Sequence, residues 1–304
     1  MVGIADLLGS SAESGGPGNV LVTGAAGFVG GAVYRRLMSR SVGVVGVDNF
    51  SVLPLDPPPG IVRMDVADLT VSDLAGFDSV LHCAAIKSVP ASFQNPKACR
   101  DDVRAGMKLV SKCVEADMPR LVLISTCEVY GVQEGPNHAG QTPQPRSPYA
   151  IGKLELENFA KSMVRGGDGR LCITRLFNVF GPRERADAVI PALCSAVAHG
   201  KPFAIEGSGE QRRDLTYIDD CVDELLPLLT SRQESHCIGS GVSWSVIDLV
   251  NIMRRLGEPV EVIHLPERPR EIPEFRFARD APRDFDMAQR ILETLQWWRK
   301  YANI

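Results

Sequence analysis

The chain has 304 residues, of which 44% are hydrophobic, and its formal net charge at pH 7 is −4. This size and apolar content allow a substantial core, which excludes disorder as the default state, and the slight acidity excludes a broad basic surface for nucleic acid. The eight cysteines form no C-x-x-C pair, so we expect no metal site, and no apolar run is long enough to cross a membrane. Because the first residues also lack a secretory signal pattern, we expect a cytoplasmic protein without a membrane partner.

Residues 1–18 are rich in Gly and Ser, and we expect them to form a flexible N-terminal arm. From Asn19 onward, helical segments alternate with short apolar runs that include V-L-V-T-G, V-G-V-V-G-V-D, S-V-L-H-C-A-A and L-V-L-I-S-T. This alternation predicts an α/β fold with a Rossmann-like, doubly wound parallel sheet, formed mainly by residues 19–180. After Gly181 the alternation loosens and proline-rich links follow, which predicts a smaller, interleaved C-terminal substrate lobe over residues 181–304.

A glycine turn follows the first predicted strand. Gly24, Gly27 and Gly30 form T-G-A-A-G-F-V-G immediately before a helix, where they permit a pyrophosphate to approach the backbone at the helix N-terminus. Asp48 ends the second strand, where its carboxylate can accept hydrogen bonds from ribose hydroxyls. No arginine follows Asp48 immediately, so the pattern favours NAD over NADP.

Two residues of a later helix point to redox chemistry. Tyr149 and Lys153 lie four residues apart in S-P-Y-A-I-G-K and therefore share one helix face. A nearby ammonium group and the positive nicotinamide would lower the pKa of the tyrosine, making it a base for a substrate hydroxyl. Thr126 ends the strand L-V-L-I-S-T, the edge at which open α/β sheets bind ligands.

Cys127 and Glu128 follow Thr126 directly. Glu128 is predicted to be a base that removes a proton next to a transient ketone; the alternative is a carboxylate that pairs at a strand end. Cys127 is either a weak acid lining the pocket or a small residue that fits there.

The ordered motifs T-G-A-A-G-F-V-G, V-D-N-F, H-C-A-A-I-K-S-V-P-A-S, S-T-C-E-V-Y-G and S-P-Y-A-I-G-K resemble those of the extended short-chain dehydrogenase/reductases. In particular they are similar to the nucleotide-sugar epimerases, dehydratases and decarboxylases of that family. The resemblance implies bound NAD, a UDP-sugar or TDP-sugar substrate, and a homodimer. It also implies that Thr126, Tyr149 and Lys153 form the redox triad, with Cys127 and Glu128 beside it.

The resemblance further implies which residues contact each ligand. The cofactor contacts would be Gly24, Gly27, Phe28, Val29, Gly30, Asp48, Asn49, Asp65, Val66, Cys83, Ala84, Ala85, Ile86, Lys87, Thr126, Tyr149, Lys153 and Phe177. The substrate contacts would be Lys87, Asn178, Arg213 and Arg268, of which the two arginines would hold the diphosphate. The chain departs from the family in two places: Asp102 or Val103 stands where an asparagine is usual, and Cys127 stands where the dehydratases carry aspartate.

The candidate reactions differ in their need for a carbon base. A simple 4-epimerase needs none, whereas the 4,6-dehydratases use an Asp-Glu pair, of which this chain keeps Glu128. We therefore expect a dehydratase that eliminates water across C5 and C6, of the 4,6 type or of the UDP-N-acetylglucosamine 5,6 type known from tunicamycin biosynthesis. The segment K-S-V-P-A-S favours instead a UDP-hexose or UDP-N-acetylhexosamine 4-epimerase. A UDP-hexuronate decarboxylase and a non-catalytic NAD-binding sensor are further alternatives.

Overall fold

The computed structural model describes residues 4–8, 17–52, 54–164, 166–267 and 271–301. Two compact units make up the chain. Unit 1 comprises residues 1–129, 142–175 and 222–236, and unit 2 comprises residues 130–141, 176–221 and 237–304. The chain therefore passes between the units several times, and each unit contains segments that are far apart in the sequence.

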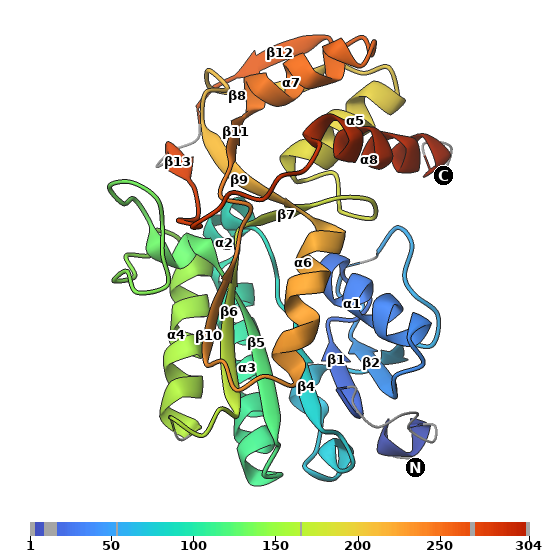
Figure 1. Ribbon diagram of the computed structural model, residues 1–304, viewed down its shortest axis with the longest axis vertical. Helices are drawn as coiled ribbons and strands as arrows, with labels where there is room; N and C mark the ends of the chain where they lie inside the picture. Colours follow the sequence, from blue (N-terminus) through green and yellow to red (C-terminus); the bar gives the residue numbers. More distant parts are fainter. Residues whose placement is uncertain (1–3, 9–16, 53, 165, 268–270, 302–304) are drawn as a thin grey trace. The chain divides into compact units, whose positions relative to one another are not determined.

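The main sheet has seven strands in the order β10-β6-β5-β4-β1-β2-β3 (Figure 1). Its strands are β1 (Val20–Thr23), β2 (Val44–Asp48), β3 (Val62–Arg63), β4 (Ser79–His82), β5 (Arg120–Thr126), β6 (Leu171–Leu176) and β10 (Ser235–Ile238). The neighbours β1–β2, β1–β4, β2–β3 and β4–β5 are parallel. The predicted Rossmann-like, doubly wound sheet is confirmed. Its strand order reverses at β1, so ligands are expected at the carboxyl ends of β1 and β4.

Alternating side chains of these strands form the core of unit 1. One face of the sheet contributes Leu21, Val45, Val80 and Leu121, which share a cluster with Leu109 and Val110 of α3 (Pro96–Glu115) and with Leu156 and Ala160 of α4 (Pro148–Met163). Burying each leucine or valine side chain stabilises the fold by about 1.5–3 kcal/mol. Ile4 of the short helix η1 (Ile4–Leu7) also belongs to this cluster, so this part of the expected arm lies against the core.

The helices of unit 1 begin where the sequence supplies caps. Asn95 accepts a hydrogen bond from the Ala98 N–H at the start of α3, and Ser147 accepts one from the Ala150 N–H at the start of α4. A proline occupies the first turn of each helix, a position where the missing N–H costs nothing. The remaining elements are α1 (Phe28–Ser39), η2 (Val66–Asp68), η3 (Ser72–Leu74), α2 (Val89–Gln94), η4 (Cys127–Tyr130) and η5 (Leu226–Leu229).

Unit 2 is organised around β9 (Arg212–Tyr217). This strand pairs with β7 (Asn178–Phe180), β11 (Ser243–Ser245) and β13 (Glu274–Phe275), and β8 (Phe203–Glu206) pairs separately with β12 (Val262–Leu265). Its helices are α5 (Val189–Ala198), α7 (Val246–Arg255) and α8 (Met287–Tyr301), while α6 (Ile218–Leu225) continues from β9 into unit 1. In the part of the chain that the structure describes, no helix is long and apolar enough to cross a membrane.

Candidate active site

The turn between β1 and α1 is built from glycines because side chains would not fit there. Gly24 has a φ of +68°, and a Cβ added to it would lie 2.6 Å from the Ala84 nitrogen. A Cβ on Gly30 would collide with the Gly24 carbonyl oxygen. Gly27, the N-cap of α1, is exposed and places no side chain before the helix N-terminus, where Phe28 and Val29 begin the first turn. Exposed N–H groups at a helix N-terminus suit a pyrophosphate.

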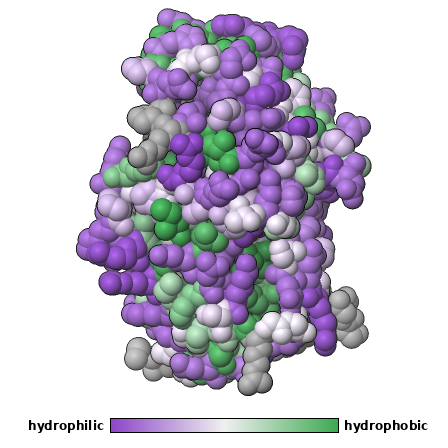
Figure 2. Space-filling model, turned by 90° about the vertical axis from the view of Figure 1, so that its left-hand side faces the viewer, coloured by the Kyte–Doolittle hydropathy of each residue, from purple (hydrophilic) through white to green (hydrophobic). Residues whose placement is uncertain are grey.

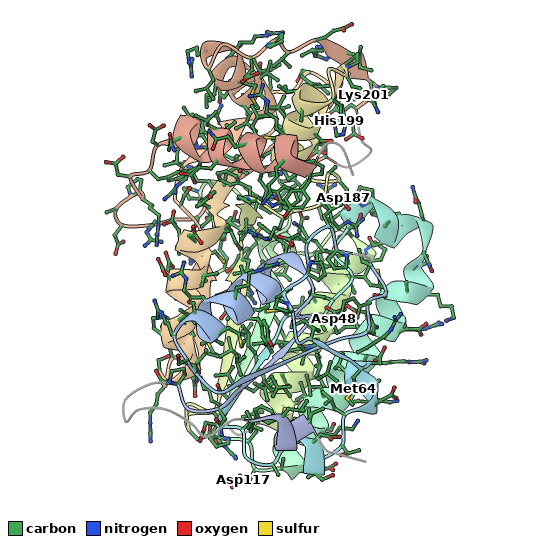
Figure 3. All side chains as sticks on the ribbon, turned by 90° about the vertical axis from the view of Figure 1, so that its right-hand side faces the viewer. Asp48, Met64, Asp117, Asp187, His199 and Lys201 are labelled. Atoms are coloured by element: carbon green, nitrogen blue, oxygen red, sulfur yellow. The ribbon has the colours of Figure 1, made fainter. Side chains whose placement is uncertain are left out.

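Asp48 and its neighbours connect this turn to the ends of β2 and β3. The Asp48 carboxylate, labelled in Figure 3, accepts hydrogen bonds from the Ala26 N–H at 3.1 Å and the Phe50 N–H at 2.7 Å. Asn49 donates to Asp65 at 2.8 Å, and Asp65 in turn caps the short helix that begins with buried Val66. The residues predicted for ribose and adenine therefore lie in one hydrogen-bonded group. Asp48 also has a structural role that the sequence did not reveal.

The segment predicted to line the cofactor, Cys83, Ala84, Ala85, Ile86 and Lys87, follows β4 directly. Ahead of it, the His82 ring lies 2.7 Å from the Thr23 hydroxyl, which also accepts the Ala84 N–H. Burial, with a smaller contribution from the charge of Lys153, lowers the pKa of His82 to about 3, so this ring is neutral. The neutral histidine therefore holds the start of the segment against β1, a role that sequence analysis missed. Lys87 itself is exposed.

Tyr149 and Lys153 lie on the first turns of α4, the helix that Ser147 caps. Lys153 is buried, and its ammonium group donates to the Ile124 carbonyl at 3.1 Å. Burial lowers the pKa of Lys153, and the charges of Asp102, Cys83 and Glu157 oppose this. The ammonium group is thus held in place at the carboxyl end of β5.

The pKa of Tyr149 differs from the expectation for a phenolate. Burial raises the pKa of Tyr149, a hydrogen bond with Thr126 opposes the rise, and the charges of Glu128, Cys127 and Asp102 add to it. The expected lowering therefore does not arise from the protein alone, because burial outweighs it. The positive charge that bound NAD brings would favour the phenolate.

Thr126 ends β5, and η4 begins with Cys127 in the next position. The Glu128 N–H donates to the Thr126 hydroxyl at 3.2 Å, which folds the turn back on the strand end. Cys127 is 3% exposed, whereas Glu128 is only half-buried. The structure thus brings Thr126, Glu128 and Tyr149 together at one strand end. Thr126 forms a hydrogen bond with the Tyr149 phenol, and the Glu128 charge raises the pKa of the same phenol.

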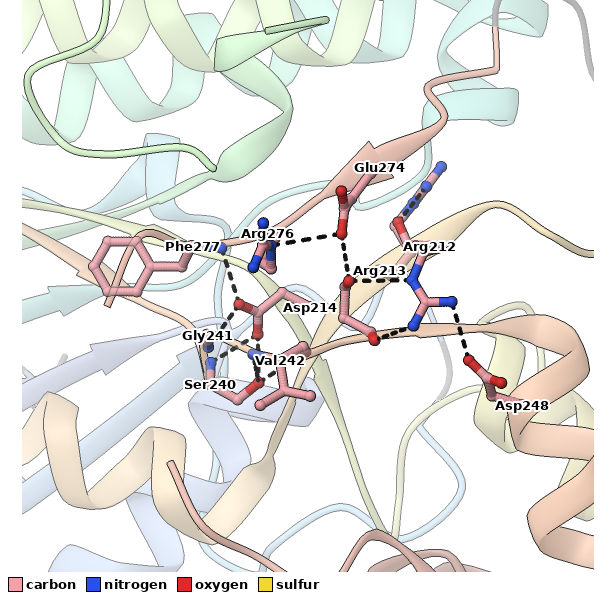
Figure 4. A network of polar contacts seen from close by, with 11 residues as sticks. Arg212, Arg213, Asp214, Ser240, Gly241, Val242, Asp248, Glu274, Arg276 and Phe277 are labelled. Carbon is pink, nitrogen blue, oxygen red and sulfur yellow. Dashed lines mark hydrogen bonds and ion pairs between the residues drawn. The ribbon is translucent and has the colours of Figure 1, made fainter. Parts of the chain in front are cut away.

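Of the residues predicted to hold the substrate, Asn178 and Arg213 belong to unit 2, whereas Lys87 belongs to unit 1. Asn178 is exposed at the start of β7, directly after Phe177, a predicted cofactor contact that is buried with its ring centre 5.5 Å from that of Phe277. Arg213 donates to the Glu271 carboxylate and, at 2.9 Å, to the Ile272 carbonyl (Figure 4 shows its surroundings). Arg268 lies outside the described residues.

Comparisons with known proteins decide the family. Residues 20–238 match the family described as "NAD dependent epimerase/dehydratase family". The chain belongs to this family. NAD is accordingly its cofactor, and the residues of the glycine turn and of Asp48 offer the donors and acceptors that a dinucleotide requires.

Individual members of the NAD dependent epimerase/dehydratase family differ in reaction. The "Uncharacterized UDP-glucose epimerase YtcB" of Bacillus subtilis (strain 168) is 30% identical over 274 residues, which are 82% of this chain and 85% of that protein. The structure of TunA, an NAD dependent NDP-hexosamine 5,6-dehydratase involved in tunicamycin biosynthesis, is 37% identical, with a TM-score of 0.87 over 93% of this chain and 98% of that one. MoeE5 in complex with UDP-glucose and NAD is 30% identical, with a TM-score of 0.83 over 93% and 99%.

A buried charge network connects α4, which carries Tyr149 and Lys153, to the sheet. Glu157 follows Tyr149 and Lys153 at the same four-residue spacing and is completely buried. Arg175 of β6 donates to its two carboxylate oxygens at 3.0 and 2.6 Å, and Ser125 of β5 donates a further hydrogen bond. Two strands of the sheet are thereby tied to α4 one turn beyond Lys153. The spacing of four was visible in the sequence, but the contacts of Glu157 with Arg175 and Ser125 were not.

Proposed function

We propose that this protein is an NAD-dependent dehydratase that eliminates water across C5 and C6 of a UDP-hexosamine such as UDP-N-acetylglucosamine. The observation that carries the proposal is the turn after β5, where half-buried Glu128 lies two residues after Thr126 and donates its N–H to the Thr126 hydroxyl at 3.2 Å. A carboxylate at this point serves a reaction that removes a proton from carbon, which simple C4 epimerisation by hydride transfer does not require. The likeness to TunA supports the same assignment.

The residues divide the chemistry between them. NAD, when bound, would supply the hydride acceptor for C4 and the source of the hydride that returns. Tyr149, hydrogen-bonded to Thr126, takes the proton of the C4 hydroxyl, and Lys153 stabilises the phenolate that prepares this step. The C4 ketone acidifies the C5 hydrogen, which Glu128 removes as a proton while the C6 hydroxyl departs. Return of hydride to C4 and of a proton from Tyr149 restores the alcohol, so the net change is the loss of one water.

The departing hydroxyl needs a proton to leave as water. Two donors lie in the turn after Thr126: the Cys127 thiol and Glu128 once it has taken the C5 proton. The Cys127 thiol is buried, and Glu128 is partly accessible. A Cys127→Ser variant separates these routes, because a hydroxyl fits the site but is a much weaker acid than a thiol.

The direct test is product analysis with a panel of UDP-sugars and TDP-sugars in deuterium oxide. The proposal expects a product lighter by one water and incorporation of deuterium at C5 of recovered substrate. Unchanged mass with a new sugar isomer would show an epimerase, and loss of carbon dioxide would show a decarboxylase. Absence of turnover with every sugar would support a sensor that binds NAD without catalysis.

The runner-up is a UDP-sugar 4-epimerase, which the likeness to YtcB favours. The segment K-S-V-P-A-S was the sequence feature in its support. In the structure Ser88 caps α2 through the Ala91 N–H at 3.1 Å, and buried Ser92 donates to the Val89 carbonyl at 2.6 Å. Both hydroxyls therefore serve the local helix, which accounts for this segment without a particular reaction.

We also propose that the protein forms a homodimer through the α4 side of unit 1. Figure 2 shows apolar side chains gathered on the face that lies at the left of Figure 1, where α4 runs. Phe93 of α2 is 48% exposed and Ile151 of α4 is 47% exposed. Light scattering should report a dimer for the wild-type chain and a monomer for Ile151→Arg; a monomeric wild type would reject the proposal.

A further inference from the structure

Asp102 of α3 shares a cavity with the catalytic pair. The cavity is lined by both Tyr149 and Lys153 of α4, by Asp102 and Cys99 of α3, and by Ile86 of the segment after β4. The Ile86 N–H favours the charged form of the Asp102 carboxyl, and both residues line the cavity. Asp102 is thus a charged group of the site that lies outside the expected triad.

Two glycines set the distance between the helices that carry these groups. A Cβ on Gly152 of α4 would lie 2.7 Å from the Val103 side chain of α3. A Cβ on Gly106 of α3 would lie 2.7 Å from the Leu156 side chain and 3.3 Å from the His82 ring. The close approach of α3 and α4 therefore depends on both glycines. Val103 makes this helix contact, and both Val103 and the adjacent Asp102 line the cavity.

We propose that Asp102 is a positioning residue of the active site: its carboxylate, acting across the shared cavity, keeps Lys153 as an ammonium ion and sets the pH range in which Tyr149 works. Lys153 is buried, and the positively charged nicotinamide of NAD adds to the cost of a second positive charge nearby. A carboxylate facing the same cavity offsets that cost.

The pKa of each ionisable group around the cavity is shifted in a definite direction. Burial lowers the pKa of Lys153, and among the charges that oppose it Asp102 acts most, followed by Cys83 and Glu157. Burial raises the pKa of Asp102, the Lys153 charge and the Ile86 N–H oppose this, and the charge of Asp65 adds to it. Asp102 also contributes to the raised pKa values of Tyr149 and Cys99.

The direction in which replacement of Asp102 changes the pKa values of Lys153 and Tyr149 can therefore be predicted. Loss of the negative charge removes support for the Lys153 ammonium and also removes repulsion against the Tyr149 phenolate. The pKa of each group should fall in Asp102→Asn. The acid and alkaline limbs of the pH–rate profile should both move to lower pH, because the first reports the phenol and the second reports the ammonium. Turnover on the alkaline side should fall by roughly 3–10-fold relative to wild type.

The primary experiment follows Lys153 directly and needs no substrate. In protein with NAD bound and with carbon-13-labelled lysine, the ε-methylene resonance that disappears in Lys153→Arg is titrated with pH. Asp102→Asn should move its midpoint to lower pH, and Asp102→Glu should restore it. Asp101→Asn is the matched control on the same helix, because Asp101 pairs with Lys97 at 2.6 Å and 45% of its side chain is exposed. It should leave the titration unchanged.

The outcomes are distinct. An unchanged or higher midpoint in Asp102→Asn overturns the proposal, even if activity falls, because a merely structural role would lower activity without moving the titration. Should Asp102→Asn not fold, the neutral and smaller Asp102→Ser gives the same test. The pH–rate profile rests on the proposed dehydratase function, whereas the lysine titration does not. Failure of the dehydratase assignment would therefore leave the result on Asp102 standing.

Discussion

Polar residues are used differently at the end of β5 in unit 1 and along β9 in unit 2. At the first place, Tyr149, Lys153 and Asp102 face a common cavity, and burial shifts the pKa of each. At the second, the Asp214 carboxylate accepts hydrogen bonds from the Ser240 N–H and hydroxyl and from two further N–H groups (Figure 4). The β9 carboxylate is therefore saturated by its own chain.

This difference distinguishes a carboxylate that holds the backbone together from groups that are proposed to react. Burial raises the pKa of Asp214, but four donated hydrogen bonds oppose this and hold the segments near Gly241 and Phe277 to the strand. A buried charge with its hydrogen bonds satisfied specifies a conformation. Tyr149 and Lys153 instead line a cavity, and the proposed reaction requires them to exchange protons with substrate. A perturbed pKa alone would not have distinguished the two places.

The sharpest test of this comparison replaces one tyrosine from each place. Tyr149→Phe should lower turnover by about 10²–10⁴-fold, the range for loss of a general acid–base group, while NAD stays bound. Tyr217→Phe is the matched change in unit 2, where the Arg290 guanidinium lies 4.2 Å from the Tyr217 ring centre. It should leave turnover within a fewfold of wild type. Steady-state kinetics on both variants decides; normal turnover of Tyr149→Phe would reject the hydride chemistry.

Glu128 is expected to have the next largest effect. Glu128→Gln keeps the shape of the side chain but removes the base, so dehydration should fall by at least roughly a hundredfold. Exchange of the C5 hydrogen with deuterium oxide should stop, whereas reduction of bound NAD by substrate, followed by absorbance, should continue. Exchange at C5 that persists at the wild-type rate would show that another group is the base and would reject Glu128 in that role.

The buried pair below the catalytic helix should control stability more than chemistry. Glu157→Gln removes the carboxylate that pairs with the buried Arg175 guanidinium at 2.6 Å, which should cost about 3–5 kcal/mol in the free energy of unfolding. Urea denaturation measures this loss directly. Asp101→Asn, which breaks an exposed ion pair on α3, is the control and should leave the denaturation midpoint close to that of wild type. A wild-type midpoint for Glu157→Gln would show that the pair contributes no net stability.

Local patterns predicted the sheet and the NAD site because both depend on short stretches of chain. Alternation of strands and helices identified the Rossmann-like fold, and the glycine turn and Asp48 identified the cofactor. The partners of Asp102, Glu157 and Asp214 come from segments far away in the sequence, so no local pattern joined them. The sequence left Asp102 and Val103 as alternatives for one position. The structure distinguishes them, because Val103 lies against Gly152 of α4 and Asp102 does not make this contact.

The smallest expected effect concerns Arg213, which we propose as a diphosphate ligand. Its guanidinium is already bonded to the Glu271 carboxylate, so a substrate phosphate would compete with that carboxylate for the same donors. Arg213→Gln should raise KM roughly tenfold because a bidentate donor is lost. Glu271→Gln should instead lower KM by a fewfold, since the neutral amide competes less well, with kcat nearly unchanged. If Glu271→Gln raises KM as much as Arg213→Gln does, Glu271 orients the arginine for the phosphate instead of competing with it, and β9 then serves substrate binding as directly as β5 serves catalysis.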